Sequence, residues 1–168
     1  MSNTNEIVER IAQIQVLIEV EGAPRPNVIL AEPYQPSLTS SANCPFFINE
    51  IHGGVSDIPI SAGQQYIEED IHMVLCIRRK EASTDLKLTI KEVVMWRDAV
   101  YTAFAERVKL SNPIYDDVPG QSHIGLSFVV DGVITSWNDI EYEYGDSVYL
   151  ALRFIFHINE MFVTEIAP

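Results

Sequence analysis

Histidines and cysteines are the side chains here that could ligate a metal or pair as base and nucleophile. The four histidines stand at positions 52, 72, 123 and 157, and the two cysteines at 44 and 76. His72 and Cys76 share one face of a predicted strand, but a rise of about 3.3 Å per residue separates them by about 13 Å. Two ligands of one zinc ion lie much closer together, so this pair alone does not predict a metal centre.

Carboxylates cluster at two places, where paired acids could act as general acid and base. Glu68, Glu69 and Asp70 are consecutive, and Glu141 and Glu143 alternate on another predicted strand. Such side chains are rarely buried, so the solvated face of a strand explains both groups better than a catalytic pair. The chain also has no glycine-rich phosphate loop, no G-x-S-x-G elbow and no H-E-x-x-H motif. We therefore expect no enzyme, no cofactor and no metal site.

The excess of acidic over basic side chains limits the kinds of partner that the protein could bind. The 168 residues carry 24 acidic and 11 basic side chains, a formal net charge of -13. Nucleic-acid phosphates and anionic membrane surfaces both attract clustered Lys and Arg, so this excess of negative charge argues against both as partners. Two explanations of the acidity remain open. It keeps a soluble protein in solution, or it gives DNA a surface that it passes without sticking.

Composition and length favour one domain with a packed core, because 47% of the 168 residues are hydrophobic. No run approaches the roughly 20 apolar residues of a membrane span. Residues 1–6 lack the basic-then-apolar pattern of a signal peptide. Two cysteines without a C-x-x-C spacing argue against a disulfide framework. We expect a protein of the cytosol, or one that is assembled there.

A long helix over residues 83–110 is the element around which the other predicted elements are arranged. Its apolar residues recur at the spacing of one helix face, and we expect Phe104 to pack against Phe154 of the final strand. Residues 83 and 84 are suited to capping its start, and Asn112-Pro113 to ending it. The face predicted to pack on a sheet consists of Leu86, Ile90, Val93, Val100, Tyr101, Phe104 and Val108.

A second, weaker stripe on this helix offers a face to a neighbour. Its small side chains allow close approach by another helix, either the one predicted near the N-terminus or one of a second subunit. Arg97 falls within the main apolar stripe. Either its methylenes pack while its guanidinium reaches water, or it forms an ion pair across an interface. The residues predicted for this interface are Leu88, Met95, Arg97, Ala99 and Ala103.

Alternation of apolar and polar side chains predicts two long strands, at 64–79 and 147–159. Shorter strands are predicted at 28–30, 46–51 and 140–144 from their composition.

Glycines indicate the turns. Gly53-Gly54 suggests a turn followed by a loop, Asp131-Gly132 a two-residue hairpin, and Gly145-Asp146 the turn before the final strand. The predicted fold class is α+β, with a curved, mostly antiparallel sheet of about four to five strands packed against an N-terminal helix and one long central helix. One domain spans residues 1–168, with long loops at about 22–45 and 111–125.

The C-terminal half and the order of the elements together resemble a known family. The segment Glu141-Tyr-Glu-Tyr-Gly-Asp-Ser-Val-Tyr149 leads into an apolar strand over residues 150–158, after a helix, a proline-rich loop, a long alternating strand, a long helix and a hairpin. In this layout most of the chain resembles the tail terminator, or tail completion, proteins of long-tailed bacteriophages. The loops at 24–45 and 111–122 look long for the family, which leaves open a sister role in the neck.

The resemblance implies a structural role in the virion. Subunits would close into a homo-oligomeric ring, a hexamer, that caps the tail tube, ends its polymerisation and joins it to the head side. Partners would be a tail tube protein and a head-side neck or connector protein, assembled in the host cytoplasm without a membrane. DNA would pass without specific binding. Alternation places the residues predicted to line the channel on strand faces away from the apolar one: Glu68, Asp70, Glu141 and Glu143.

Two other classes of function stay open. One is a monomeric or dimeric binding module, such as an immunity or adaptor protein. The other is a small-molecule enzyme that uses the polar face of strand 64–79. The native mass separates the ring from the module.

Overall fold

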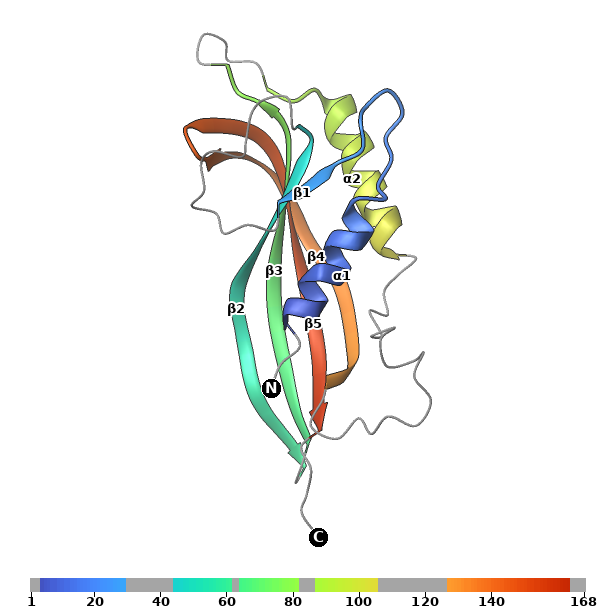
Figure 1. Cartoon of the computed structure of the whole chain (residues 1–168), viewed down its shortest axis with the longest axis vertical. Coiled ribbons are helices and arrows are strands. Elements are labelled where there is room, and N and C mark those ends of the chain that lie inside the picture. The colour runs from blue at the N-terminus through green and yellow to red at the C-terminus, as the bar shows by residue number, and fades with distance from the viewer. Residues whose placement is uncertain (1–3, 30–43, 62–63, 82–86, 106–126, 164–168) are drawn as a thin grey trace.

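The computed structural model describes residues 4–29, 44–61, 64–81, 87–105 and 127–163. These residues form two helices and five strands (Figure 1). In chain order the elements are α1 (Thr4–Gln15), β1 (Asn27–Ile29), β2 (Phe46–Ser61), β3 (Gln64–Arg79), α2 (Ile90–Ala105), β4 (Ser127–Tyr144) and β5 (Ser147–Val163).

The strands make one open, mixed sheet in the order β1-β2-β3-β5-β4. The short β1 pairs parallel to the start of β2, and every other neighbouring pair is antiparallel. Both helices lie on the same side of this sheet (Figure 1). The predicted α+β class with a curved sheet is confirmed. None of the helices in the described ranges is long and apolar enough to cross a membrane.

The core between helices and sheet follows from the two periodicities in the sequence. Apolar residues of α1 recur every three or four positions, and those of β3 and β5 recur every second position, so each element buries one face. We call this set the helix-side core: Ile7, Ile11, Ile14, Ile18, Phe47, Ile71, Met73, Leu75, Trp96, Val100, Phe104, Leu152, Phe154, Phe156 and Ile158.

The sheet curls strongly away from the helices at one end. Strands β2 and β4 are three strand spacings apart in the sheet order, about 14 Å in a flat sheet. Yet the rings of Phe46 on β2 and Tyr144 on β4 have centroids only 6.2 Å apart. We therefore call the face opposite the helices the concave face. A second buried cluster fills it at this end, formed by Phe46, Ile48, Val74, Cys76, Tyr144, Tyr149 and Ala151.

Polar contacts fasten each helix to the sheet. Gln15 at the end of α1 is fully buried, and its amide exchanges hydrogen bonds of 2.7 and 2.9 Å with the amide of Asn49 on β2. This reciprocal pair satisfies groups that would be costly to bury alone. The second helix is attached to β3. The Arg78 guanidinium donates hydrogen bonds to the carbonyl of Lys87 at 2.8 Å and to the carboxylate of Glu92 at 3.3 Å, which ties β3 to the start of α2.

The predicted helix begins seven residues too early. Residues 87–89 are not helical, and α2 starts at Ile90. Thr89 caps it, because its hydroxyl oxygen accepts the backbone N–H of Glu92 at 3.1 Å. Ile90, predicted to be core, is 84% exposed, and Trp96 is buried instead. The caps predicted at residues 83 and 84, together with Leu86, Val108 and Asn112-Pro113, lie outside the described residues.

The aromatic contacts of α2 with β5 also differ from the prediction, by two residues along β5. Phe104 lies against Phe156, with ring centroids 5.1 Å apart. Phe154 lies beside Tyr101 instead, at 6.1 Å. The helix does cross the apolar face of the final strand, as expected. The partner of Phe104 is simply the next inward-facing residue of β5.

Two predicted turns are wrong, and each is replaced by continuous strand. Asp131-Gly132 lies inside β4, where Gly132 is paired with Ile158. Gly53-Gly54 lies inside β2, at a register shift between Ile51 and Gly54 where the pairing with β3 is irregular. The predicted strand at 64–79 is confirmed to the residue. The turn at Gly145 is also confirmed, with φ 60°.

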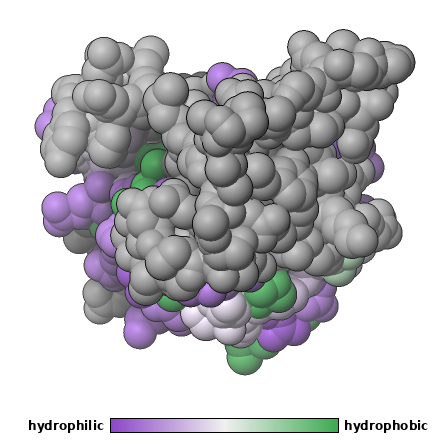
Figure 2. Space-filling view, turned by 90° about the horizontal axis from the view of Figure 1, so that it is seen from below, coloured by the Kyte–Doolittle hydropathy of each residue, from purple (hydrophilic) through white to green (hydrophobic). Residues whose placement is uncertain are grey.

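One end of the sheet extends beyond both helices. Strands β2, β3, β4 and β5 run for 16, 16, 18 and 17 residues, and their lower ends in Figure 1 have neither α1 nor α2 beside them. We call this end the arm: β2 from 55 to 61, β3 from 64 to 68, β4 from 127 to 131, and β5 from 159 to 163. Figure 2 views the molecule from this end, and its visible described surface is mostly hydrophilic with a few hydrophobic patches.

Candidate functional site on the concave face of the sheet

Polar side chains gather on the concave face between its apolar cluster and the arm. Strand pairing sets Glu50 of β2 opposite His72 of β3, and Asp70 of β3 opposite His157 of β5. These residues alternate with Ile71 and Met73 of the helix-side core, so they point to the opposite face. The sheet therefore brings together residues that are far apart in the sequence.

Glu50 is the centre of the first group. Its carboxylate accepts a hydrogen bond from the hydroxyl of Tyr142 on β4, and it pairs with Nε2 of His52 at 2.9 Å. Burial acts to raise the pKa of Glu50, but the hydrogen bonds from Tyr142 and His52 outweigh it, and the pKa lies below its usual value. Burial, and then the bond to Glu50, raises the pKa of Tyr142. At neutral pH this is a carboxylate held by a neutral phenol, and it joins β4 to β2 across the concave face.

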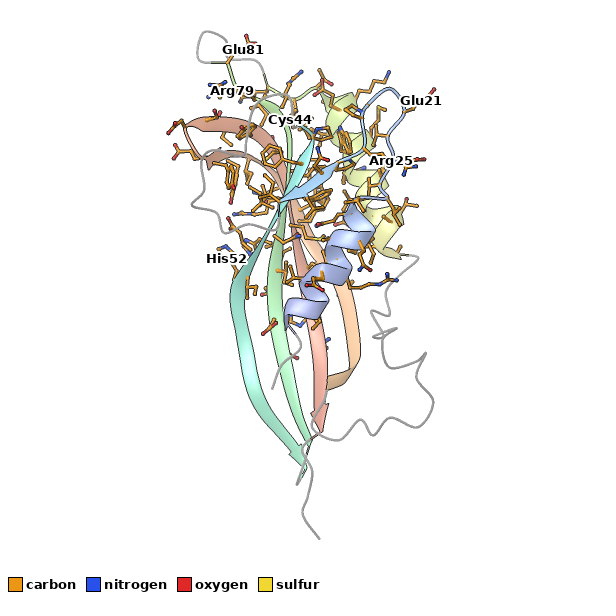
Figure 3. The ribbon with its side chains drawn as sticks, in the orientation of Figure 1. Glu21, Arg25, Cys44, His52, Arg79 and Glu81 are labelled. Carbon is orange, nitrogen blue, oxygen red and sulfur yellow. The ribbon has the colours of Figure 1, made fainter. Side chains whose placement is uncertain are left out.

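Two histidines stack beside this group. The rings of His52 and His72 are 3.9 Å apart and nearly parallel, at 11°. His52 projects from β2 on the side away from the helices (Figure 3). Burial lowers the pKa of His72, and the nearby His52 and Arg153 lower it further. The two rings therefore disfavour a doubly charged stack, because a proton on one opposes a proton on the other.

A separate pair lies one row closer to the arm. Nδ1 of His157 on β5 is 2.7 Å from the Asp70 carboxylate on β3. Glu68, two residues before Asp70 on β3, lies on the same face and is paired opposite Asn159. A carboxylate that accepts a hydrogen bond from an imidazole fixes the tautomer of that ring. Asp70 is thus committed to His157, whereas Glu68 has no such histidine opposite it.

Hydrogen bonds hold the carboxylates, the phenol and the imidazoles of this face together. Within the described ranges, no group of three or more His, Cys, Asp or Glu residues is placed to hold a metal ion. The thiols are not activated either. Burial raises the pKa of Cys76, which is fully enclosed, and of Cys44, which is half-buried. A thiol with a raised pKa is a poor nucleophile at neutral pH.

Comparison with known proteins adds no family. No protein-family model matches the chain, and no curated protein sequence matches it. A functional conclusion therefore depends on the geometry of the sheet and on the charges it displays.

The four predicted channel residues separate into two pairs. Glu68 and Asp70 lie on the concave face. Glu141 pairs opposite Leu150, and Glu143 opposite Val148, on the helix side of β4. Alternation predicted that each of the four lies on a strand face away from the apolar residues, and for Glu141 and Glu143 those residues are Ile140, Tyr142 and Tyr144 on the concave face. The four carboxylates nevertheless do not share one face of the sheet, and their place in a channel stays a prediction.

The predicted interface stripe is divided between the molecule's own core and its surface. Ala99 and Ala103 pack against the helix-side core, and Leu88 does so from just before α2. The guanidinium of Arg97 lies 5.3 Å from the centre of the Trp137 ring and 2.9 Å from the carboxylate of Asp98. Its partners are thus within the subunit, a cation–π contact and a neighbouring acid. Contact of Met95 and Arg97 with a second subunit stays a prediction.

Sequence reasoning missed the group around Glu50 altogether. Its members come from three strands, and only the pairing register brings them together. One signal was present: Glu50 and His52, like Asp70 and His72, are an acid and a histidine two residues apart on one strand face. Two such pairs on consecutive strands were a reason to expect a polar cluster.

Proposed function

We propose that this chain is a structural virion protein that forms a ring at the top of a phage tail tube, where it ends tube polymerisation and joins the tail to the head or neck. The observation that carries the proposal is the arm, the end of the sheet that extends past α1 and α2 (Figure 1). A sheet needs a second layer against at least one face, and the two helices supply it only at the other end.

Lengths make the mismatch clear. A strand of 16 residues, such as β2 or β3, spans roughly 54 Å. The helices have 12 and 16 residues, which corresponds to about 18 and 24 Å. Neighbouring subunits in a ring would supply the layer that the two described helices do not provide, through head-to-tail contacts in which each arm lies against the next subunit. This is why an extended sheet favours an assembly protein over a monomeric module.

The polar concave face suits the inner side of such a ring. Glu68 and Asp70 present carboxylates near the arm, and the whole chain has a net charge of -13. A carboxylate surface repels DNA over about a Debye length, roughly 8 Å at physiological salt. Duplex DNA would therefore pass without the phosphate contacts that make binding tight.

The experiment is a measurement of native mass, alone and together with tail tube protein. We expect a closed homo-oligomer of six subunits, formed either in solution or only on the tube. A matched variant replaces residues 56–67 with a two-residue Asn-Gly turn, which joins β2 to β3 where Val55 pairs with Glu68. This variant removes residues 56–61 of β2 and 64–67 of β3, which differ in number because the pairing there has register shifts, and it keeps the rest of both strands.

The shortened variant should be a monomer with a cooperative thermal unfolding transition, and it should form no ring. Rings formed equally well by this variant would show that the arm is not the assembly surface. A full-length chain that stays monomeric or dimeric in both conditions would overturn the proposal in favour of a binding module.

A further inference from the structure

The segment of β4 between Ser136 and Tyr144 forms an outer edge of the sheet made by the described strands. β4 is the last strand in the sheet order, and in the described part of the chain no strand pairs with its outer side. The register with β5 is regular from Ser136 to Tyr144, with no shift and no proline. An edge of this kind presents free backbone donors and acceptors, and an added strand can pair with them.

The side chains along this edge are sorted by face. Toward the helix side, Asp139, Glu141 and Glu143 form an exposed acidic row. Toward the concave face, Ile140 and Tyr142 are partly buried and pack against the apolar cluster there. A strand laid beside β4 would place its own residues alternately opposite carboxylates and opposite apolar side chains.

We propose that this edge binds an extended strand of a different protein, in which basic residues occupy every second position and apolar residues stand between them. The acidic row already accepts a cation within the chain, because Nζ of Lys80 lies 2.7 Å from the Glu141 carboxylate. A basic strand would extend that pattern to Asp139 and Glu143. The inference does not depend on ring formation.

A second copy of this chain does not meet these requirements. Two β4 edges set side by side would place carboxylates opposite carboxylates, which is destabilising. At the other side of the sheet, β2 has β1 beside it only at Phe46–Ile48, and the rest of β2 contains Pro59 and three register shifts, features that protect an edge from pairing. None of the described strands alternates Lys or Arg with apolar residues.

The test uses the full chain and two synthetic peptides of identical composition. One alternates Lys with Val or Ile, and the other has the Lys residues in one block and the apolar residues in another. Binding is measured by titration calorimetry, and hydrogen exchange locates the protected amides. We expect the alternating peptide to bind and to protect residues 136–144, and the block peptide to bind at least about tenfold more weakly, since only alternation satisfies both faces of the edge.

Two charge-matched variants complete the test. Asp139→Lys with Glu143→Lys should weaken binding of the alternating peptide by roughly tenfold or more, because two attractive cross-strand pairs become repulsive. Glu9→Lys with Glu21→Lys makes the same charge change at exposed positions away from β4 and should leave binding unchanged. Equal binding of both peptides, equal weakening by both variants, or protection at β2 in place of β4 would each overturn the proposal.

Discussion

The ring of Phe156 lies so close to the backbone of Gly132 that a side chain at this position would collide with it. A Cβ atom built on Gly132 comes closer to the ring than real contacts allow. Phe156 is buried and held by Phe104, so it has little room to move. We predict that Gly132→Ala lowers the free energy of unfolding by about 1–3 kcal/mol, the usual cost of overpacking a core. Urea unfolding measures it.

A neighbour supplies the control for that substitution. Val133 is 52% exposed, so Val133→Ala should change the free energy of unfolding by no more than about 0.5 kcal/mol. Combining Gly132→Ala with Phe156→Leu should cost less than the sum of the two single changes, because the smaller side chain relieves the collision. A strictly additive double variant would mean that the ring and the glycine do not interact.

His72 should make stability depend on pH between neutral and mildly acidic conditions. Its pKa is lowered in the fold by burial and then by His52 and Arg153, while the unfolded imidazole keeps a value near 6.5. The unfolded state therefore takes up its proton at higher pH. The stabilisation is fully present above about 6.5 and is lost as the pH falls through the lowered folded value.

Urea unfolding between pH 7.5 and 5 tests this for the original chain and for His72→Gln. The variant should show a flatter dependence over that interval. His52→Gln should flatten it in part, because it removes one of the charges that oppose protonation of His72. An unchanged slope in His72→Gln would assign the pH dependence to another group.

At the scale of elements, one threonine determines where α2 begins. The Thr89 hydroxyl caps the helix through the N–H of Glu92. We predict that Thr89→Ala lowers the free energy of unfolding by about 1 kcal/mol, the usual loss for an N-cap. Thr102→Ala is the control, at an exposed position inside the same helix. Alanine is the better helix former there, so this change should be neutral or slightly stabilising. Equal losses at both positions would contradict the capping role.

The sequence predicts an element correctly where neighbouring residues alone determine the structure, and it fails where a residue type fits several structures. Alternation in β3 identified both ends of the strand, because its apolar residues recur at every second position through the buried Ile71, Met73 and Leu75. Gly132 led to a wrong prediction of a turn, because glycine is equally suited to a turn and to a position in close contact with an aromatic ring. Only the fold shows that the Phe156 ring lies against it. The same limit applies to α2, where Ser83, Thr84 and Thr89 are all suitable caps.

The contacts across the concave face could not be predicted from the sequence, for a different reason. The contact between Tyr142 and Glu50 joins strands that are not neighbours in the sheet, and it exists because the sheet curls. The register also depends on irregular pairings, such as the shift between Cys76 and Arg78 of β3, which single residues do not reveal.

At the scale of the whole molecule, the separation of the predicted channel residues onto two faces provides an internal control. Glu68 lies on the concave face and Glu143 on the helix side, so Glu68→Lys and Glu143→Lys make the same charge change on opposite faces. If the concave face lines a ring, only Glu68→Lys places new cations around the passing duplex. Each added phosphate contact should steepen the salt dependence of binding by about 0.9 in the log–log slope.

The shape of the DNA then distinguishes inside from outside. Rings of Glu68→Lys should bind linear duplex, which can enter through a free end, and should bind covalently closed circles much more weakly. They should also slow genome ejection, because the lumen now holds the phosphates. Rings of Glu143→Lys should bind linear and circular DNA alike, if they bind either. Equal affinity of Glu68→Lys rings for both forms of DNA would place Glu68 on the outside, and the acidity of the concave face would then serve only solubility.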